Sequence, residues 1–183
     1  FILDELKRRA EEHGGESVVV SLWPHPRIVL DKQLDNFKLL HSREEKIREM
    51  DNYGIDHLVV IPFTKEFAAT TANTFVEDIL VKKIGVCKLV VGYDHHFGRN
   101  REGSFGELMR LARQHSFEVE QIPAQVLHQA GHPRVHLCAA QGCIVCLLAS
   151  RRLQQRGSGQ GVPASRFISS IVIRLRSFRS SFS

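Results

Sequence analysis

The segment Lys88-Leu89-Val90-Val91-Gly92-Tyr93-Asp94-His95-His96-Phe97-Gly98-Arg99-Asn100-Arg101-Glu102-Gly103 joins an apolar run to a polar, ionisable loop. The apolar run predicts a buried strand that ends at Gly92. In open α/β sheets, ligands bind just past the carboxyl ends of the strands. Glycines let backbone approach a ligand closely, and arginines offer forked donors to phosphate oxygens. We therefore expect a phosphate-containing ligand here; the alternative is an ordinary loop with solvated charges.

Helix and strand patterns alternate along the first 122 residues. Helices are predicted for residues 1–13, from the capping box of Ser42 and Glu45 to Gly54, from Thr71 to about Lys83, and from Ser104 to about His115. Strands are predicted for Ser17–Trp23, His57–Ile61, Cys87–Val91 and Phe117–Ile122. Such alternation favours an α/β fold with a parallel, doubly wound sheet and right-handed crossovers.

Four segments together resemble the FMN adenylyltransferase module of the prokaryotic bifunctional riboflavin kinase and FAD synthetase. They are Leu22-Trp23-Pro24-His25-Pro26-Arg27, residues 58–68, residues 75–80 and residues 88–103. The resemblance covers roughly residues 1–125 and implies a Rossmann-like nucleotidylyltransferase fold. It also implies the reaction: the FMN phosphate attacks the α-phosphorus of ATP, pyrophosphate leaves, and FAD forms. ATP and FMN are then the substrates, and magnesium is the cofactor.

The resemblance also suggests which residues bind FMN or the phosphates of ATP. Asp94 matches a family position occupied by Asn or Asp, where one carboxylate can hold magnesium. Trp23 stands where relatives often carry an acidic residue, and we expect it either to leave that role unfilled or to stack on the flavin ring. His95 and His96 are either ligand donors or solvated loop side chains. The expected binding residues are Pro24, His25, Pro26, Thr64, Phe67, Gly92, Asp94, Phe97, Gly98, Arg99 and Arg101, with Phe67 alternatively a core residue.

Two ATP-binding elements of the family are not found in their usual places. In the family a His-x-Gly-His turn precedes the first helix, whereas this chain starts at Phe1, inside that helix. A Ser-Ser-Thr-x-x-Arg element should follow the strand ending near Ile122, and the nearest match is Ser169–Arg174, where isoleucine replaces threonine. We interpret this late match as coincidence. We expect an incomplete domain, truncated at its amino terminus, that makes no FAD by itself.

Residues 126–183 differ in composition from the rest of the chain. They hold eight of the 25 Lys and Arg residues and none of the 20 Asp and Glu residues. The favoured interpretation is a tail translated from a shifted reading frame. The alternatives are a disordered basic arm and a zinc site. The zinc ligands would come from His132, His136, Cys138, Cys143 and Cys146.

Charge and hydropathy limit the kinds of partner and the location that the sequence suggests. Because the basic excess lies in the tail, the pI of about 9.2 does not indicate a nucleic-acid-binding surface on residues 1–125. The chain shows neither a signal peptide nor an apolar run of membrane-spanning length, so we expect a cytoplasmic location. A riboflavin kinase domain is expected downstream in the intact parent. Two alternatives to this enzyme stay open: a non-catalytic flavin- or nucleotide-binding α/β module, and a nucleotidylyltransferase acting on pantetheine phosphate or nicotinate nucleotide.

Overall fold

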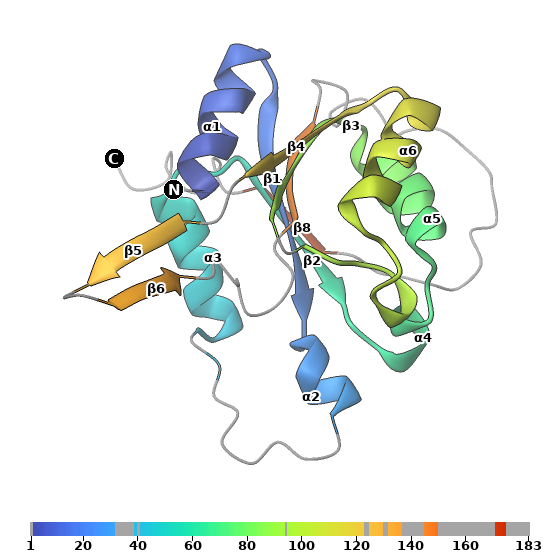
Figure 1. Ribbon diagram of the computed structural model, residues 1–183, viewed down its shortest axis with the longest axis horizontal. Helices are drawn as coiled ribbons and strands as arrows, with labels where there is room; N and C mark the ends of the chain where they lie inside the picture. The colour runs from blue at the N-terminus through green and yellow to red at the C-terminus, as the bar shows by residue number, and fades with distance from the viewer. Residues whose placement is uncertain are drawn as a thin grey trace.

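A six-stranded sheet with helices on both faces forms the centre of the molecule (Figure 1). The computed structural model describes residues 2–31, 39, 41–93 and 95–122, and the backbone of four later strands. The helices are α1 (Ile2–Glu12), α2 (Pro26–Leu30), α3 (Arg43–Asn52), α4 (Lys65–Ala68), α5 (Ala72–Thr74), η1 (Phe75–Ile84), η2 (Arg99–Arg101) and α6 (Phe105–His115). The strands are β1 (Glu16–Trp23), β2 (His57–Pro62), β3 (Val86–Gly92), β4 (Glu118–Ile122), β5 (Gln125–Gln129), β6 (His132–His136), β7 (Val145–Ala149) and β8 (Ile171–Arg174).

The strand order is β4-β3-β7-β1-β2-β8. β1 pairs with β2 and β3 with β4 in parallel, which confirms the α/β fold predicted for residues 1–122. β7 lies between β1 and β3 and runs antiparallel to both, and β8 pairs antiparallel with β2. The sheet as a whole is therefore mixed, whereas the two strand pairs within residues 1–122 are parallel, as predicted. Its antiparallel strands both come from the tail; the domain boundary at residue 125 and the origin of the tail stay predictions.

Two apolar layers cover the two faces of the sheet. In β1, Val18 and Val20 pack in the cluster that contains residues of η1 and α6. Val19, between them, packs with Leu6 of α1 and Met50 of α3 on the opposite face. Successive side chains of a strand point to opposite faces, so a continuous apolar run supplies both layers. Figure 1 shows α1 and α3 on one side of the sheet and α5 and α6 on the other.

The predicted helix ends are confirmed. Ser42 and Glu45 form both bonds of a capping box, at 3.1 and 2.7 Å. The hydroxyl of Thr71 accepts a bond from the first turn of α5. Gly54 and Gly85 have φ values of 76° and 75°, the left-handed conformation that ends a helix. The short helices α2, α4 and η2 were not predicted, because three to five residues show no helical periodicity.

A buried polar contact joins the starts of β1 and β2. The Ser17 hydroxyl donates to Asp56 Oδ2 at 2.7 Å, and the Ser17 backbone N–H donates to the same oxygen at 2.8 Å. The Asp56 N–H in turn donates to the Ser17 hydroxyl oxygen at 2.9 Å. Both residues are buried, so each bond satisfies a group that water does not reach.

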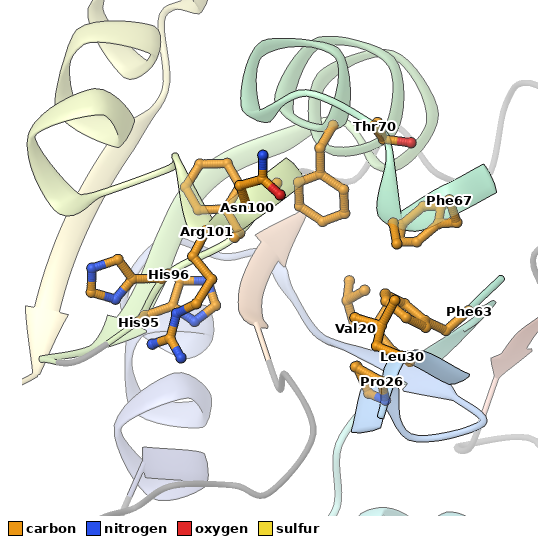
Figure 2. A pocket seen from close by; sticks show the side chains of 15 residues that line it. Val20, Pro26, Leu30, Phe63, Phe67, Thr70, His95, His96, Asn100 and Arg101 are labelled. Carbon is orange, nitrogen blue, oxygen red and sulfur yellow. The ribbon is translucent and has the colours of Figure 1, made fainter. Parts of the chain in front are cut away.

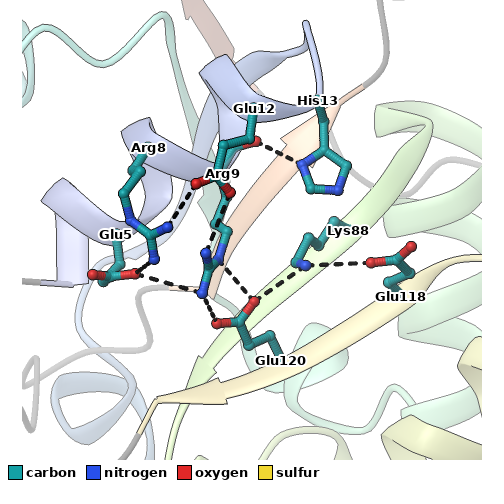
Figure 3. A network of polar contacts seen from close by, with 8 residues as sticks. All are labelled: Glu5, Arg8, Arg9, Glu12, His13, Lys88, Glu118 and Glu120. Atoms are coloured by element: carbon teal, nitrogen blue, oxygen red, sulfur yellow. Dashed lines mark hydrogen bonds and ion pairs between the residues drawn. The ribbon is translucent and has the colours of Figure 1, made fainter.

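An ion-pair network connects α1 to strands β3 and β4 of the sheet (Figure 3). Arg9 Nε donates to Glu120 Oε2 of β4 at 2.9 Å, and Lys88 Nζ of β3 lies 3.1 Å from the same oxygen. The hydrogen bond from Arg9 lowers the pKa of Glu120, and Lys88 adds to this effect. The network therefore fixes α1 to β4, although 111 residues separate Arg9 from Glu120 in the chain.

Ser17→Ala should lower the free energy of unfolding by about 1–3 kcal/mol, because it leaves the buried Asp56 carboxylate and N–H with fewer partners. Urea denaturation measures the change. Ser21→Ala is the matched control: Ser21 is equally buried in β1, but its hydroxyl bonds to the flexible Lys46 side chain. A smaller effect is expected at Ser21, and equal effects would contradict the importance of the Ser17–Asp56 contact.

Glu120→Gln should lower stability at neutral pH by about 0.5–1 kcal/mol, a value kept small because both partners are partly exposed. The folded pKa of Glu120 lies below its ordinary value of 4.5, so its contribution is present above that value and is lost as pH falls through the folded pKa. Unfolding of the wild type and the variant should therefore converge in acid. Glu118→Gln is the control, because Glu118 is mostly exposed. A difference between wild type and Glu120→Gln that persists at pH 2 would contradict the account.

Candidate functional site

A cavity of about 320 Å³ opens where β1, β2 and β3 end (Figure 2). Its walls come from the end of β1, from α2, from residues 63–75 after β2 and from residues 95–101 after β3. The carboxyl ends of the parallel strands meet at this edge, which is where the sequence predicted a ligand. Each of the four segments that carry the family resemblance therefore contributes residues to the cavity.

Aromatic side chains form one wall of the cavity. Phe67 of α4 packs edge-to-face against Phe63 and Phe75, with ring centroids 5.8 and 6.2 Å apart. Phe75 in turn contacts Phe97 at 5.8 Å. Edge-to-face packing favours fixed ring orientations. The wall is thus a preformed apolar surface suited to a flat, aromatic ligand.

Polar side chains gather on the other side. Figure 2 shows His95, His96 and Arg101 together, across the cavity from Phe63 and Phe67. The ring of His95 stacks on Phe97 with centroids 5.9 Å apart. A guanidinium and two imidazoles supply donors for an anionic group. The cavity can therefore bind a molecule with an apolar ring at one end and an anion at the other.

The loop of residues 97–103 closes on itself. The Phe97 N–H donates to the Gly103 carbonyl at 3.2 Å, and the Gly103 N–H donates to the Phe97 carbonyl at 2.9 Å. Gly98 has φ 73°, and a Cβ at this position would lie 2.7 Å from the backbone nitrogen of Ala72. Only glycine fits this close approach without displacing the loop or the start of α5. The loop geometry thus sets how the polar wall faces the cavity.

The structure separates the predicted binding residues into two groups. Five of them line the cavity: Pro26, Phe67, Phe97, Gly98 and Arg101, together with His95 and His96. Five others are not among the lining residues: Pro24, His25, Thr64, Gly92 and Arg99. Asp94, the predicted magnesium ligand, lies outside the described residues. The role of each of these residues in binding stays a prediction.

Three residues away from the cavity wall have clear local contacts. The Thr64 hydroxyl caps α4 by accepting the Phe67 N–H at 3.1 Å. His25 is buried and its Nδ1 accepts the Arg27 N–H at 3.2 Å at the start of α2. Trp23 packs with the α1 and α3 cluster, on the face of the sheet opposite to the cavity. These contacts position the cavity walls and leave flavin stacking by Trp23 without geometric support.

Sequence reasoning missed several cavity residues. Val20 and Leu22 lie in a predicted strand and Phe75 in a predicted helix, and none of them was predicted to bind; all three are buried and also line the cavity. Asn100 carries a weak signal, since Asn adopts the left-handed conformation more readily than most residues and here has φ 53°. The remaining unpredicted lining residues are Leu30, Phe63, Ala68 and Thr70.

Within the part of the chain that the structure describes, no group of three or more His, Cys, Asp or Glu side chains is placed to hold a metal ion. Magnesium binding by Asp94 therefore stays a prediction. The alternative zinc site also stays a prediction. Cys138 and Cys143 lie outside the described residues, and only the backbone is described at His132, His136 and Cys146. No helix among the described residues is long and apolar enough to cross a membrane.

Comparisons with known proteins agree on one family. A family model described as FAD synthetase matches residues 1–133. The bifunctional riboflavin kinase/FMN adenylyltransferase of Escherichia coli K12 is 39% identical over 118 residues, which are 64% of this chain and 37% of that protein. An FAD synthetase of Listeria monocytogenes is 33% identical over 105 residues, covering 57% of this chain and 42% of that protein. This chain thus spans well under half the length of these curated relatives.

A solved structure supports the fold alone. The crystal structure described as a macrolide-efflux protein from Streptococcus pneumoniae matches with a TM-score of 0.57 and 22% identity, over 68% of this chain and 40% of that chain. At this identity the likeness concerns the arrangement of helices and strands, not the ligand or activity.

Gly98→Ala should destabilise the protein by about 1–3 kcal/mol, because the new Cβ meets the Ala72 backbone and the left-handed φ is unfavourable for alanine. Thermal unfolding measures the loss. The control is Gly106→Ala in α6, where the nearest atom to an added Cβ is the Ser104 hydroxyl oxygen at 3.8 Å. This control should stabilise slightly, by about 0.5–1 kcal/mol. An unfolding midpoint of Gly98→Ala equal to wild type would show that the loop does not pack on α5 as described.

Proposed function

The chain belongs to the FAD synthetase family, and we propose that its cavity binds FMN as the acceptor substrate of an FMN adenylyltransferase. The single observation that carries this proposal is the division of the cavity into an aromatic wall and a wall with Arg101, His95 and His96. FMN has the matching division, with a flat isoalloxazine ring at one end and a phosphate at the other. The named relatives from E. coli and L. monocytogenes support the same substrate.

The proposed reaction needs orientation more than covalent chemistry. An oxygen of the FMN phosphate attacks the α-phosphorus of ATP, the bond from that phosphorus to the bridging oxygen breaks, and pyrophosphate leaves with that oxygen. The aromatic wall of Phe63, Phe67 and Phe75 would hold the ring against the sheet. Arg101 and the two histidines would hold the phosphate and turn one oxygen toward ATP. Fixing two reactants in this way removes much of the entropic barrier of a bimolecular step.

Magnesium, when bound, supplies positive charge to the phosphates of the nucleotide. Asp94 is the residue that we propose to hold it, on the basis of the family resemblance alone. We assign no residue of the cavity to ATP. The cavity accounts for the flavin substrate, and ATP binding is inferred from the family resemblance alone.

The parent protein is proposed to be a bifunctional enzyme with a riboflavin kinase domain. Two relatives support this, because the E. coli protein and one protein from L. monocytogenes, 30% identical over 111 residues, are both described as bifunctional. A second L. monocytogenes relative is described only as an FAD synthetase. The full coding sequence decides between the two forms. A cytoplasmic location stays a prediction.

A non-catalytic flavin-binding module is the second candidate: the cavity accounts for flavin binding in both cases, and the relatives favour the enzyme. Incubation of the chain with FMN, ATP and magnesium, followed by chromatography for FAD, separates them. FAD formation would establish the adenylyltransferase and would contradict the expectation, drawn from the sequence, that this chain makes none. Binding of FMN without turnover would agree with that expectation.

Arg101→Ala should weaken FMN binding about tenfold and leave riboflavin binding unchanged, because only FMN carries the phosphate that Arg101 is proposed to contact. Quenching of flavin fluorescence on titration measures both affinities. Arg113→Ala is the charge-matched control, since Arg113 is exposed in α6 and does not line the cavity. Equal weakening for FMN and riboflavin, or no FMN binding by the wild type, would overturn the proposal.

A further inference from the structure

Glu102 connects the loop of residues 97–103 to the start of α5. Its Oε1 accepts a hydrogen bond from the Ala72 backbone N–H at 2.9 Å. Ala72 is the first residue of α5, and α5 continues directly into η1, which ends at Ile84. The first N–H groups of a helix have no partner within the helix, and a carboxylate is favoured at this positive end. The Glu102 carboxylate therefore satisfies a donor that the helix itself leaves open.

Two backbone contacts join the same segments. The Arg99 N–H donates to the Thr70 carbonyl at 2.8 Å, and Gly98 lies so close to Ala72 that no side chain fits between them. Thr70 also lines the cavity. The loop and the start of α5 thus form one wall, and the Glu102 carboxylate provides the side-chain bond that joins its two parts.

The loop needs such support because its backbone is strained. Asn100 and Arg101 have φ values of 53° and 60°, in the left-handed region that residues with a Cβ rarely adopt. Conformations of this kind persist only where the surroundings hold them in place. Both side chains line the cavity, so any relaxation of this backbone would move them away from a bound ligand.

We propose that Glu102 is a positioning residue for FMN: by accepting the Ala72 N–H, it holds the strained loop so that Asn100 and Arg101 face the ligand. Glu102 is exposed and is not among the residues that line the cavity, so it acts through its neighbours. The choice of FMN as ligand rests on the proposed function, whereas the effect of Glu102 on the loop does not.

Three variants of the full chain test this role. Glu102→Ala removes the acceptor, Glu102→Gln keeps an oxygen that can accept the same bond, and Glu11→Ala removes one exposed carboxylate from α1, on the opposite face of the sheet. Two measurements are made on each: FMN affinity by fluorescence quenching, and the rate of tryptic cleavage after Arg99 and Arg101 by mass spectrometry. Cleavage reports loop order without any ligand.

Glu102→Ala should weaken FMN binding about tenfold and accelerate cleavage at both arginines, by loss of a charge-assisted hydrogen bond. Glu102→Gln should restore most of both properties, and Glu11→Ala should match wild type. FMN affinity and cleavage unchanged in Glu102→Ala would overturn the proposal, as would equal losses in the alanine and glutamine variants. If the wild type binds no FMN but Glu102→Ala still accelerates cleavage, the proposed ligand fails while the positioning of the loop by Glu102 stands.

Discussion

Parallel pairing of β1 with β2 brings together the apolar part of the site. The register runs from Val18 opposite His57 to Trp23 opposite Pro62, so both strands end at the same edge of the sheet. The segments that leave this edge are α2 on one strand and the Phe63–Phe75 region on the other. Their apolar side chains meet because the strands that carry them stop together. A shift of one residue would exchange the two faces of a strand and turn Val20 and Leu22 of β1 away from the cavity.

The two faces of the sheet have different tasks. The face toward α1 and α3 is covered by an apolar layer, and the ion pairs of Arg9, Glu120 and Lys88 stabilise it further. The face toward α4, η1 and α6 is apolar as well, but near the strand ends its layer opens into the cavity. Val20 and Leu22 belong to both the core and the cavity wall. Packing and ligand binding therefore depend on the same side chains, and a large change at either position should affect both.

Local sequence signals predicted the regular elements well. The predicted capping residues Ser42, Thr71 and Ser104 each lie at the start of a helix. Their hydroxyls accept backbone N–H groups of the first turn, so a hydroxyl before a helical pattern is a strong local signal. The antiparallel placement of β7 had no such signal: its pairing with β1 and β3 is a contact between segments far apart in the chain. Short-range patterns contain no information on which distant strand completes a sheet.

The candidate site was predicted in outline and not in detail. Phe67, Phe97 and Arg101 were identified from the resemblance and line the cavity. Thr64 was assigned to binding by the same reasoning, yet its hydroxyl is engaged in capping α4. Threonine before a helix and threonine in a binding loop look alike in sequence, and only the backbone geometry separates them. Glu102 was not predicted to have a role. An acidic residue in a polar loop has no sequence feature that indicates its hydrogen bond to the Ala72 N–H.

We propose that the flavin binds on the face of the sheet that α4 and the loop after β3 cover. Amide NMR spectra of the chain, recorded during titration with FMN, locate the binding face. Shifts are expected at Ala68, Thr70 and Gly98, which line the cavity, and none at Ala10 or Met50, which are buried on the opposite face. Shifts centred on α1 and α3, or a spectrum unchanged at saturating FMN, would contradict it.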